Sequence, residues 1–168
     1  MGWSTEFPAP LARLHELEFD FDVMDFEPYD EFWPLSENRS WLQAWTGNEA
    51  AESEGFRVFG MDGTGGQVAF WLANDGVELL DQPVVFLGSE GETGVVARDF
   101  GDYLWLLAGG IGPMEAVEYG ADDVKPQKHF EDFAREVAPD KQKSPAEVLA
   151  LAKATHPDFE AKLEAMCK

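Results

Sequence analysis

Three short apolar runs with turn sequences between them constrain the fold of this chain more than any other feature. They lie at residues 56–59, 67–72 and 83–87, and a fourth candidate follows at 94–97. β-Branched and aromatic residues dominate these runs, as is typical of strands. The glycine-rich segment 60–66 and the Asn-Asp-Gly at 74–76 supply turns. Because parallel strands need crossovers of roughly a dozen or more residues, these short connections predict a mainly antiparallel sheet.

Helical patterns precede and follow the predicted sheet. The segments predicted to be helical are 11–17, 37–45, 100–108, 126–137, 146–155 and 158–166. Ser36 and Ser144 are the candidate N-caps of the second and fifth segments. Gly109-Gly110 and then Pro113 are expected to end the third. The combination predicts an α+β fold with a helical C-terminal segment.

A packed core is expected despite the high charge, because 45% of the 168 residues are hydrophobic and 13% are aromatic. The core is predicted from the inward-facing positions of the strands and from the apolar faces of two helices. Its predicted members are Trp41, Trp45, Phe59, Phe70, Leu72, Val85, Leu87, Phe100, Leu104 and Leu107.

The acidic residues are concentrated in the first three-quarters of the chain. Residues 1–124 contain 25 acidic and four basic side chains, whereas residues 125–168 contain eight of each, so the net charge of −21 belongs to the first part. We therefore divide the chain into an acidic domain, 1–124, and a charge-balanced helical segment, 125–168, that packs on it or extends from it. This charge argues against binding to nucleic acid or to an anionic membrane, because both depend on Lys and Arg.

The single cysteine and the N-terminal sequence bear on location. Cys167 has no partner for an internal disulfide, and the first residues lack the basic and apolar regions of a signal peptide. The apolar stretches of the sequence are far shorter than the roughly 18 residues needed to span a bilayer. A cytoplasmic location is expected.

Six carboxylates within twelve residues form the densest acidic segment, which we call the acidic block. They are Asp20, Asp22, Asp25, Glu27, Asp30 and Glu31, and aromatic residues alternate with them. One interpretation is an amphipathic element with a solvated acidic face, whose periodicity fits a strand and a helix equally. The other is a docking face for a basic partner, with aromatic anchors and an acidic rim. A calcium loop is disfavoured, because Met24 and Asp25 replace the next ligand and the turn glycine.

The motifs that usually mark catalytic or metal sites are incomplete in this sequence. Gly60 and Gly65 have the spacing of a phosphate-binding loop, but Gly66 and Gln67 stand where Lys and a hydroxyl residue are required. The pair at 15–16 begins like a zinc-protease motif, but the second His is missing. We therefore expect no enzymatic activity, no metal and no cofactor, and we expect the glycine-rich turn to be conformational.

Four short motifs follow one another between residues 36 and 112. They are Phe59-Gly60 with Asp62-Gly63 and Gly65-Gly66, the strand containing Trp71, the segment from Pro83 to Gly88, and the helix beginning at Phe100. This ordered set resembles the SUKH superfamily, which includes the yeast cell-wall assembly and killer-toxin-resistance regulators. The resemblance implies an α+β fold with helices around a curved, mainly antiparallel sheet, and it implies no catalytic residues.

The resemblance also implies a function. Many bacterial members look like immunity proteins that bind and neutralise a toxin, so a protein-binding role is expected. Nuclease toxins are usually basic, and a protein with a net charge of −21 would be steered onto such a target, with the acidic block as the contact. The motif positions expected to be structural are Gly60, Asp62, Gly63, Gly65, Gly66, Trp71, Pro83 and Gly88. The alternative is a regulatory or scaffold module whose acidity serves only solubility.

Overall fold

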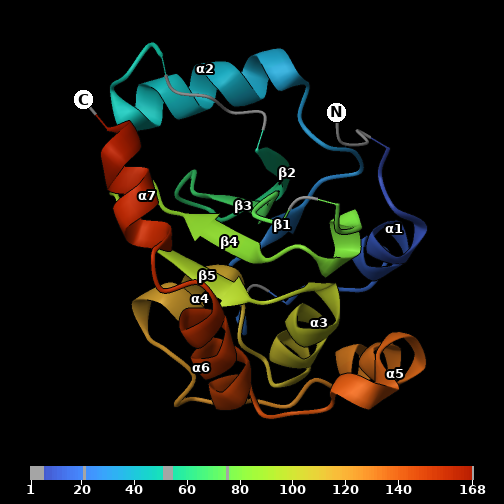
Figure 1. Ribbon diagram of the computed structural model, residues 1–168. Coiled ribbons are helices and arrows are strands. Elements are labelled where there is room, and N and C mark those ends of the chain that lie inside the picture. Colours follow the sequence, from blue (N-terminus) through green and yellow to red (C-terminus); the bar gives the residue numbers. More distant parts are fainter. Residues whose placement is uncertain (1–5, 21, 51–54, 75, 168) are drawn as a thin grey trace.

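The computed structural model describes residues 6–20, 22–50, 55–74 and 76–167. Within them lies one antiparallel sheet in the order β1-β2-β3-β4-β5, surrounded by seven α-helices, which confirms the predicted α+β class (Figure 1). The strands are β1 Glu27–Pro28, β2 Phe56–Met61, β3 Gln67–Trp71, β4 Val84–Leu87 and β5 Thr93–Ala97. The helices are α1 Ala9–His15, α2 Leu35–Thr46, α3 Phe100–Ala108, α4 Pro113–Glu118, α5 Lys128–Val137, α6 Pro145–Thr155 and α7 Phe159–Met166, with 3₁₀ turns at Leu79–Asp81 and Pro139–Lys141.

All four predicted strands lie in the sheet, as a meander in which each strand pairs with the next along the chain. A bulge in β2 leaves Phe59 without a cross-strand partner, because Val58 and Gly60 pair with adjacent residues of β3. The strand β1 was not predicted. It lies in the acidic block and pairs with the end of β2, and the Phe59 carbonyl accepts a hydrogen bond from the Tyr29 amide.

The pleat of the sheet divides its apolar side chains between two cores, because successive residues of a strand face opposite sides. The first core joins Phe59, Val68, Phe70, Val84, Phe86 and Val96 to side chains of α1, α3 and α5. The second joins Phe56, Val58, Ala69, Val85, Leu87 and Val95 to side chains of α2 and α7. Figure 1 shows α2 above the sheet and α3 and α6 below it. Both faces are therefore covered, which explains why the strands are apolar at consecutive positions.

The predicted core residues are all at least half buried. Seven of the ten are buried, whereas Trp41, Trp45 and Leu72 are half-buried. The two tryptophans belong to α2, where Leu42 takes the fully buried position between them. Helix α2 therefore presents Leu42 to the sheet and leaves its Trp side chains at the margin of the second core.

The start of α2 differs from its prediction, and one helix, α4, was not predicted. Ser36 is not an N-cap: α2 begins at Leu35, directly after Pro34, and no side chain caps it. The non-helical conformation of Pro34 allows the helix to start two residues earlier than expected. Helix α3 ends before the two glycines as predicted, but Pro113 then starts α4, a helix that was not predicted. Pro is favourable at a first helical position, because its missing N–H would have no intrahelical partner there.

The C-terminal segment is packed into both cores. Phe130 and Phe133 of α5 are buried in the first core, and Phe159 and Leu163 of α7 are buried in the second. At the start of α6, Ser144 forms the predicted cap, as a capping box with the side chain three residues further on. These helices contribute side chains to both cores, so their removal would expose apolar surface on both faces of the sheet.

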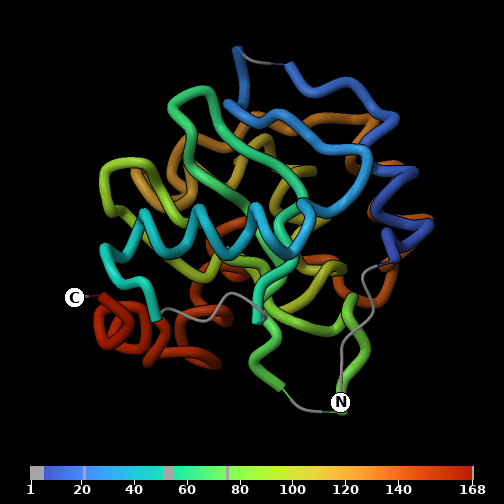
Figure 2. Tube along the Cα trace, turned by 90° about the horizontal axis from the view of Figure 1, so that it is seen from above, coloured from blue at the N-terminus to red at the C-terminus, as the bar shows by residue number. Residues whose placement is uncertain are grey.

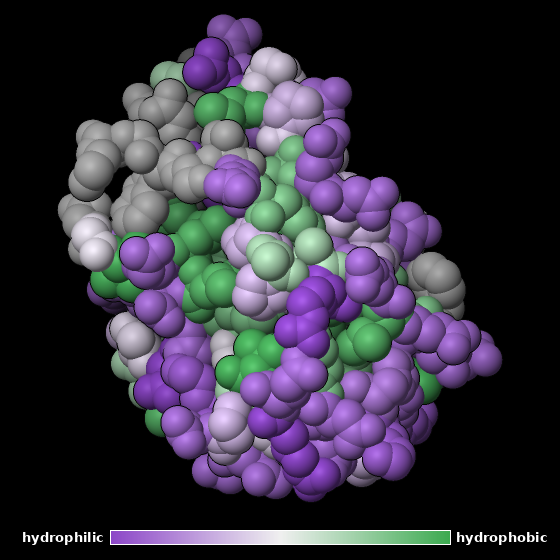
Figure 3. Space-filling model, turned by 90° about the vertical axis from the view of Figure 1, so that its right-hand side faces the viewer, coloured by the Kyte–Doolittle hydropathy of each residue, from purple (hydrophilic) through white to green (hydrophobic). Residues whose placement is uncertain are grey.

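The surface that carries α1 and α5 is mainly hydrophilic, with apolar side chains visible between charged ones (Figure 3). Arg13 of α1 lies over the Phe133 ring and pairs with Glu136 of α5, so one side chain joins the two helices. In the described part of the chain, Leu35, Tyr119 and Val124 are the large hydrophobic residues that are exposed. None of the described helices is long and apolar enough to cross a bilayer.

Candidate functional site at the turn end of the sheet

The β2–β3 and β4–β5 turns lie side by side at one end of the sheet, which we call the turn end. A meander places alternate turns at the same end, and Figure 2 shows both there, in green and yellow-green. The Ser89 hydroxyl of the second turn donates a hydrogen bond to the Thr64 hydroxyl of the first, over 3.1 Å. The glycine-rich segment and the Pro83–Gly88 segment, which are far apart in the sequence, therefore meet here.

The buried Asp62 carboxylate organises the first turn. It accepts hydrogen bonds from the amides of Thr64, at 3.1 Å, and Gly66, at 2.7 Å, and from the Thr64 hydroxyl. Gly65 has a φ of +96°, in the region that favours glycine. A Cβ at Gly66 would lie 2.8 Å from the Phe86 ring. These contacts give the turn a conformational role, and the Asp62 oxygens are used within the turn.

Further positions of the four sequence motifs also make packing contacts. A Cβ at Gly60 would lie 2.4 Å from the Phe26 ring, and a Cβ at Gly88 would overlap the Glu92 side chain. Pro83, which immediately precedes β4, accepts a hydrogen bond at its carbonyl from the Trp71 amide. The close approach at Gly60 disfavours a larger residue there, because the Phe26 ring is buried, whereas the flexible Glu92 side chain could move away from a Cβ at Gly88.

Trp71 is the motif residue that contacts the C-terminal segment. Its ring lies 4.7 Å from the Phe159 ring, between centroids, and 5.4 Å from that of His156. The Lys162 ammonium lies over the same ring at 5.2 Å. Trp71 therefore connects the end of β3 to α7, and its ring is covered in part by a cation of the chain itself.

The acidic block is mostly solvated. Five of its carboxylates are exposed, and Asp25 is half-buried. None of the six forms an ion pair with a Lys or Arg of the described chain. Apart from the two residues of β1, the block has neither helical nor strand structure where it is described. It is thus an irregular acidic surface segment.

Asp25 is a carboxylate of the acidic block that hydrogen-bonds directly to the β2–β3 turn. Its Oδ1 accepts a hydrogen bond of 2.8 Å from the Gly63 amide, and its own amide donates to Glu115 Oε2 over 2.9 Å. Burial raises the pKa of Glu115, and the charges of Asp25 and Asp62 raise it further. Glu115 Oε1 is buried without a hydrogen-bond partner among the described residues. The turn end therefore gathers acidic groups from three separate segments.

The aromatic side chains of the acidic block do not form an exposed set of anchors. Phe26 and Phe32 are buried in the first core, and Phe19 and Tyr29 are half-buried. Phe21 lies outside the described residues. The idea that aromatic residues of this block anchor a partner therefore fails at Phe26 and Phe32, because the protein uses these rings to hold its own N-terminal segment on the sheet.

A groove of about 800 Å³ opens beside the turn end, between α2, the β4–β5 turn and α7; we call it the α2–α7 groove. Its charged lining residues are Glu90, Glu92, Glu160 and Glu164. Its larger apolar lining residues are Trp45, Val117 and Leu163. No sequence motif predicted this site, although one signal was present: residues 160 and 164 are four apart, which places them on one face of the last helix.

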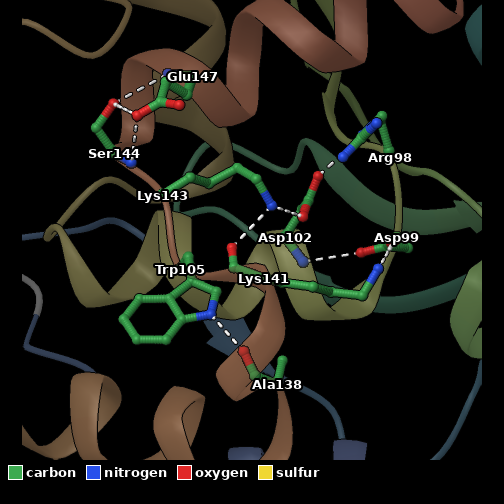
Figure 4. Close-up of polar contacts among 9 residues, drawn as sticks. All are labelled: Arg98, Asp99, Asp102, Trp105, Ala138, Lys141, Lys143, Ser144 and Glu147. Carbon is green, nitrogen blue, oxygen red and sulfur yellow. Dashed lines mark hydrogen bonds and ion pairs between the residues drawn. The ribbon is translucent and has the colours of Figure 1, made fainter.

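A second charged cluster lies between α3 and the C-terminal segment (Figure 4). The Asp102 carboxylate is fully buried, and it pairs with Arg98 at 3.1 Å and with Lys143. Lys141 pairs with Asp99, whose side chain also caps α3. These three cations leave both carboxylates neutralised within the cluster. Its chemistry is that of a structural connection between the two parts of the chain.

Comparisons with known proteins supply no relative for this chain: no protein-family model, no curated protein and no solved structure matches it. Where the chain is described, no group of three or more His, Cys, Asp or Glu side chains is arranged to hold a metal ion.

Proposed function

We propose that this protein is a non-enzymatic binding module for a basic protein, of the immunity type that neutralises a toxin. The observation that carries the proposal is the acidic block, with five exposed carboxylates and no ion pair to a described cation. Uncompensated charge of one sign attracts a partner of the opposite sign over about a Debye length and raises the association rate. The resemblance to the SUKH superfamily supports the immunity type.

The distribution of cations strengthens this proposal. The C-terminal segment contains eight basic residues, but Lys141 is paired with Asp99, the N-cap of α3, and Lys143 with Asp102 of α3. Lys128 and Arg135 pair with acids of their own helix, α5. None of the cations of the segment that the structure describes forms an ion pair with the acidic block, so the field of that block remains available to a partner.

The test is the association rate with a candidate toxin encoded beside this protein. The variant replaces all six carboxylates of the acidic block by their amides, Asp→Asn and Glu→Gln. We expect the variant to associate more slowly than the wild type at low salt and the two rates to converge at high salt, because exposed charges act mainly on encounter. Stopped-flow measurements at two salt concentrations provide the comparison.

Two outcomes would contradict the proposal in different ways. Equal association rates at low salt would remove the acidic block as the steering surface. Failure of any neighbouring toxin to bind would favour the alternative of a scaffold or regulatory module. Circular dichroism of the variant serves as the folding control, since five of the six side chains are exposed and their neutralisation is expected to preserve the fold.

A further inference from the structure

We propose that the α2–α7 groove seats a cationic segment of the protein partner, one that carries Arg or Lys side chains beside an apolar side chain. This inference rests on the proposed function and extends it, because it separates where a partner is steered from where it is bound. The acidic block supplies long-range attraction, but its Phe26 and Phe32 rings are buried in the protein's own core. The block therefore has few apolar side chains left for a partner, and we place the apolar centre of the contact elsewhere.

The charge of the groove selects a cation. Four glutamates line it, two from the β4–β5 turn and two from α7, whereas its lining includes no Lys or Arg of the described chain. Glu90, Glu160 and Glu164 are exposed and Glu92 is half-buried, so the carboxylates border the opening rather than the core. Because they come from two separate elements, they can flank a bound segment on both sides.

The apolar lining of the groove favours a cationic group that is attached to an apolar one over a free cation. The half-buried Trp45 and Val117 lie in the same groove as the buried Leu163. The Trp45 indole is held in place, since its N–H donates a 2.7 Å hydrogen bond to the Gly88 carbonyl. An aromatic ring fixed in this way offers both an apolar surface and a face for a guanidinium group.

The size of the groove fits a peptide segment. Its volume of about 800 Å³ lies within the range of ligand clefts, which is roughly 300–1,000 Å³. A second hollow of about 370 Å³ shares three of its lining residues, Thr93, Val117 and Glu160, and follows β5, the edge strand of the sheet. Lys153 and His156 line this continuation, so the purely acidic part of the groove is restricted to the end near Trp45.

Cys167 allows the groove to be tested directly. It is the only cysteine of the chain, it is exposed, and it lines the groove. The probe is a short amphipathic Leu/Arg peptide, and its charge-reversed Leu/Glu counterpart is the negative control. We expect the Leu/Arg peptide to slow alkylation of Cys167 by iodoacetamide in a saturable manner, and the Leu/Glu peptide to leave the rate unchanged. For the wild type and for each variant described below, the alkylation rate with peptide is compared with the rate without peptide. This comparison removes any direct effect of a substitution on the reactivity of the thiol.

A matched pair of variants separates the groove from the general negative charge. Glu160→Gln with Glu164→Gln should raise the peptide concentration needed for half-protection by about tenfold, whereas Asp30→Asn with Glu31→Gln should raise it by less than about twofold. Both double variants remove two exposed charges. Equal weakening by the two variants, or absence of protection in the wild type, would overturn the inference.

Failure of this inference differs from failure of the proposed function. If a neighbouring toxin binds the wild type and the Glu160/Glu164 double variant with equal affinity, the groove does not bind the cationic segment of the toxin. The steering role of the acidic block is unaffected by that result. If the peptide occupies the groove but no toxin binds, the groove inference keeps its support while the immunity function fails. The two measurements therefore decide the two proposals separately.

Discussion

At the scale of single residues, His15 is the clearest case of an environment that controls protonation. Its ring lies among four phenylalanine rings, with centroid distances of 5.6 to 6.3 Å. Nδ1 lies 2.7 Å from the Tyr29 carbonyl, while Nε2 is buried without a hydrogen-bond partner among the described residues. Burial lowers the pKa of His15 below its usual 6.5, outweighing the opposite effects of the Tyr29 contact and of Asp30.

This environment predicts a loss of stability on mild acidification. The unfolded chain binds a proton near pH 6.5 more readily than the folded chain, so the contribution of neutral His15 is complete above that pH. It is lost as the pH falls below 6.5 toward the lower pKa of the folded state. We expect the difference in unfolding free energy between wild type and His15→Gln to shrink from pH 7 to pH 5, as measured by urea titration.

The matched control for this experiment is His156→Gln. The pKa of His156 is also lowered, by burial and then by Lys162, but its ring is less buried. The difference in unfolding free energy between wild type and His156→Gln should therefore change less over the same pH range. If the difference in unfolding free energy between wild type and His15→Gln stays constant with pH, His15 does not remain neutral in the folded protein.

At the scale of elements, the connection between α3 and the C-terminal segment depends on a buried charge. Asp102 has no exposed surface, and Lys143 reaches it from the segment that precedes α6. The Trp105 indole donates a 2.8 Å hydrogen bond to the Ala138 carbonyl beside it. A buried carboxylate that loses one of its cations is left partly uncompensated, and this costs much more than the loss of a surface pair.

We therefore expect Lys143→Met to destabilise the protein by about 2–4 kcal/mol. Lys128→Met is the control, because it breaks an exposed pair four residues apart on α5 and should cost less than about 1 kcal/mol. Adding Asp102→Asn to Lys143→Met should restore part of the loss, since the unpaired charge is removed. Thermal unfolding monitored by circular dichroism gives all three values. Equal small losses for the two lysine variants would show that Asp102 is adequately neutralised by Arg98 alone.

At the scale of the whole molecule, stability is expected to depend on the ionic strength. A net charge of −21 repels itself within a compact fold, and salt screens that repulsion. We expect the thermal midpoint to rise with added salt and, at low salt, the six-fold amide variant of the acidic block to melt roughly a few degrees higher than the wild type. The difference in thermal midpoint between the variant and the wild type should decrease at high salt, because salt then screens the repulsion that the substitutions remove at low salt.

The control for this experiment neutralises acids that already have partners. Glu131→Gln with Asp132→Asn removes two carboxylates that pair with Arg135 and Lys128. This variant should gain no stability at low salt, since each removed charge was compensated. If this variant gains as much stability per removed charge as the six-fold variant of the acidic block, then stability depends only on the total charge of the molecule.

The sequence by itself determined four of the five strands and most helices, whereas β1 was not predicted. Local signals suffice there: β-favouring runs between turn sequences gave residues 56–59, 67–72, 83–87 and 94–97 as strands, and the structure contains all four. The Ser144 cap follows from the same kind of signal. Such features depend on residues close together in the chain, so a single sequence contains the information they need.

Only the tertiary structure decided how charges and aromatic rings are used. The sequence does not reveal that Phe26 and Phe32 turn inward while their acidic neighbours stay in solvent, or that Lys143 neutralises Asp102. The α2–α7 groove likewise depends on a helix and a turn that are about 70 residues apart in the chain. Burial and pairing depend on which segments pack together, and a pattern of neighbouring residues does not specify those long-range contacts.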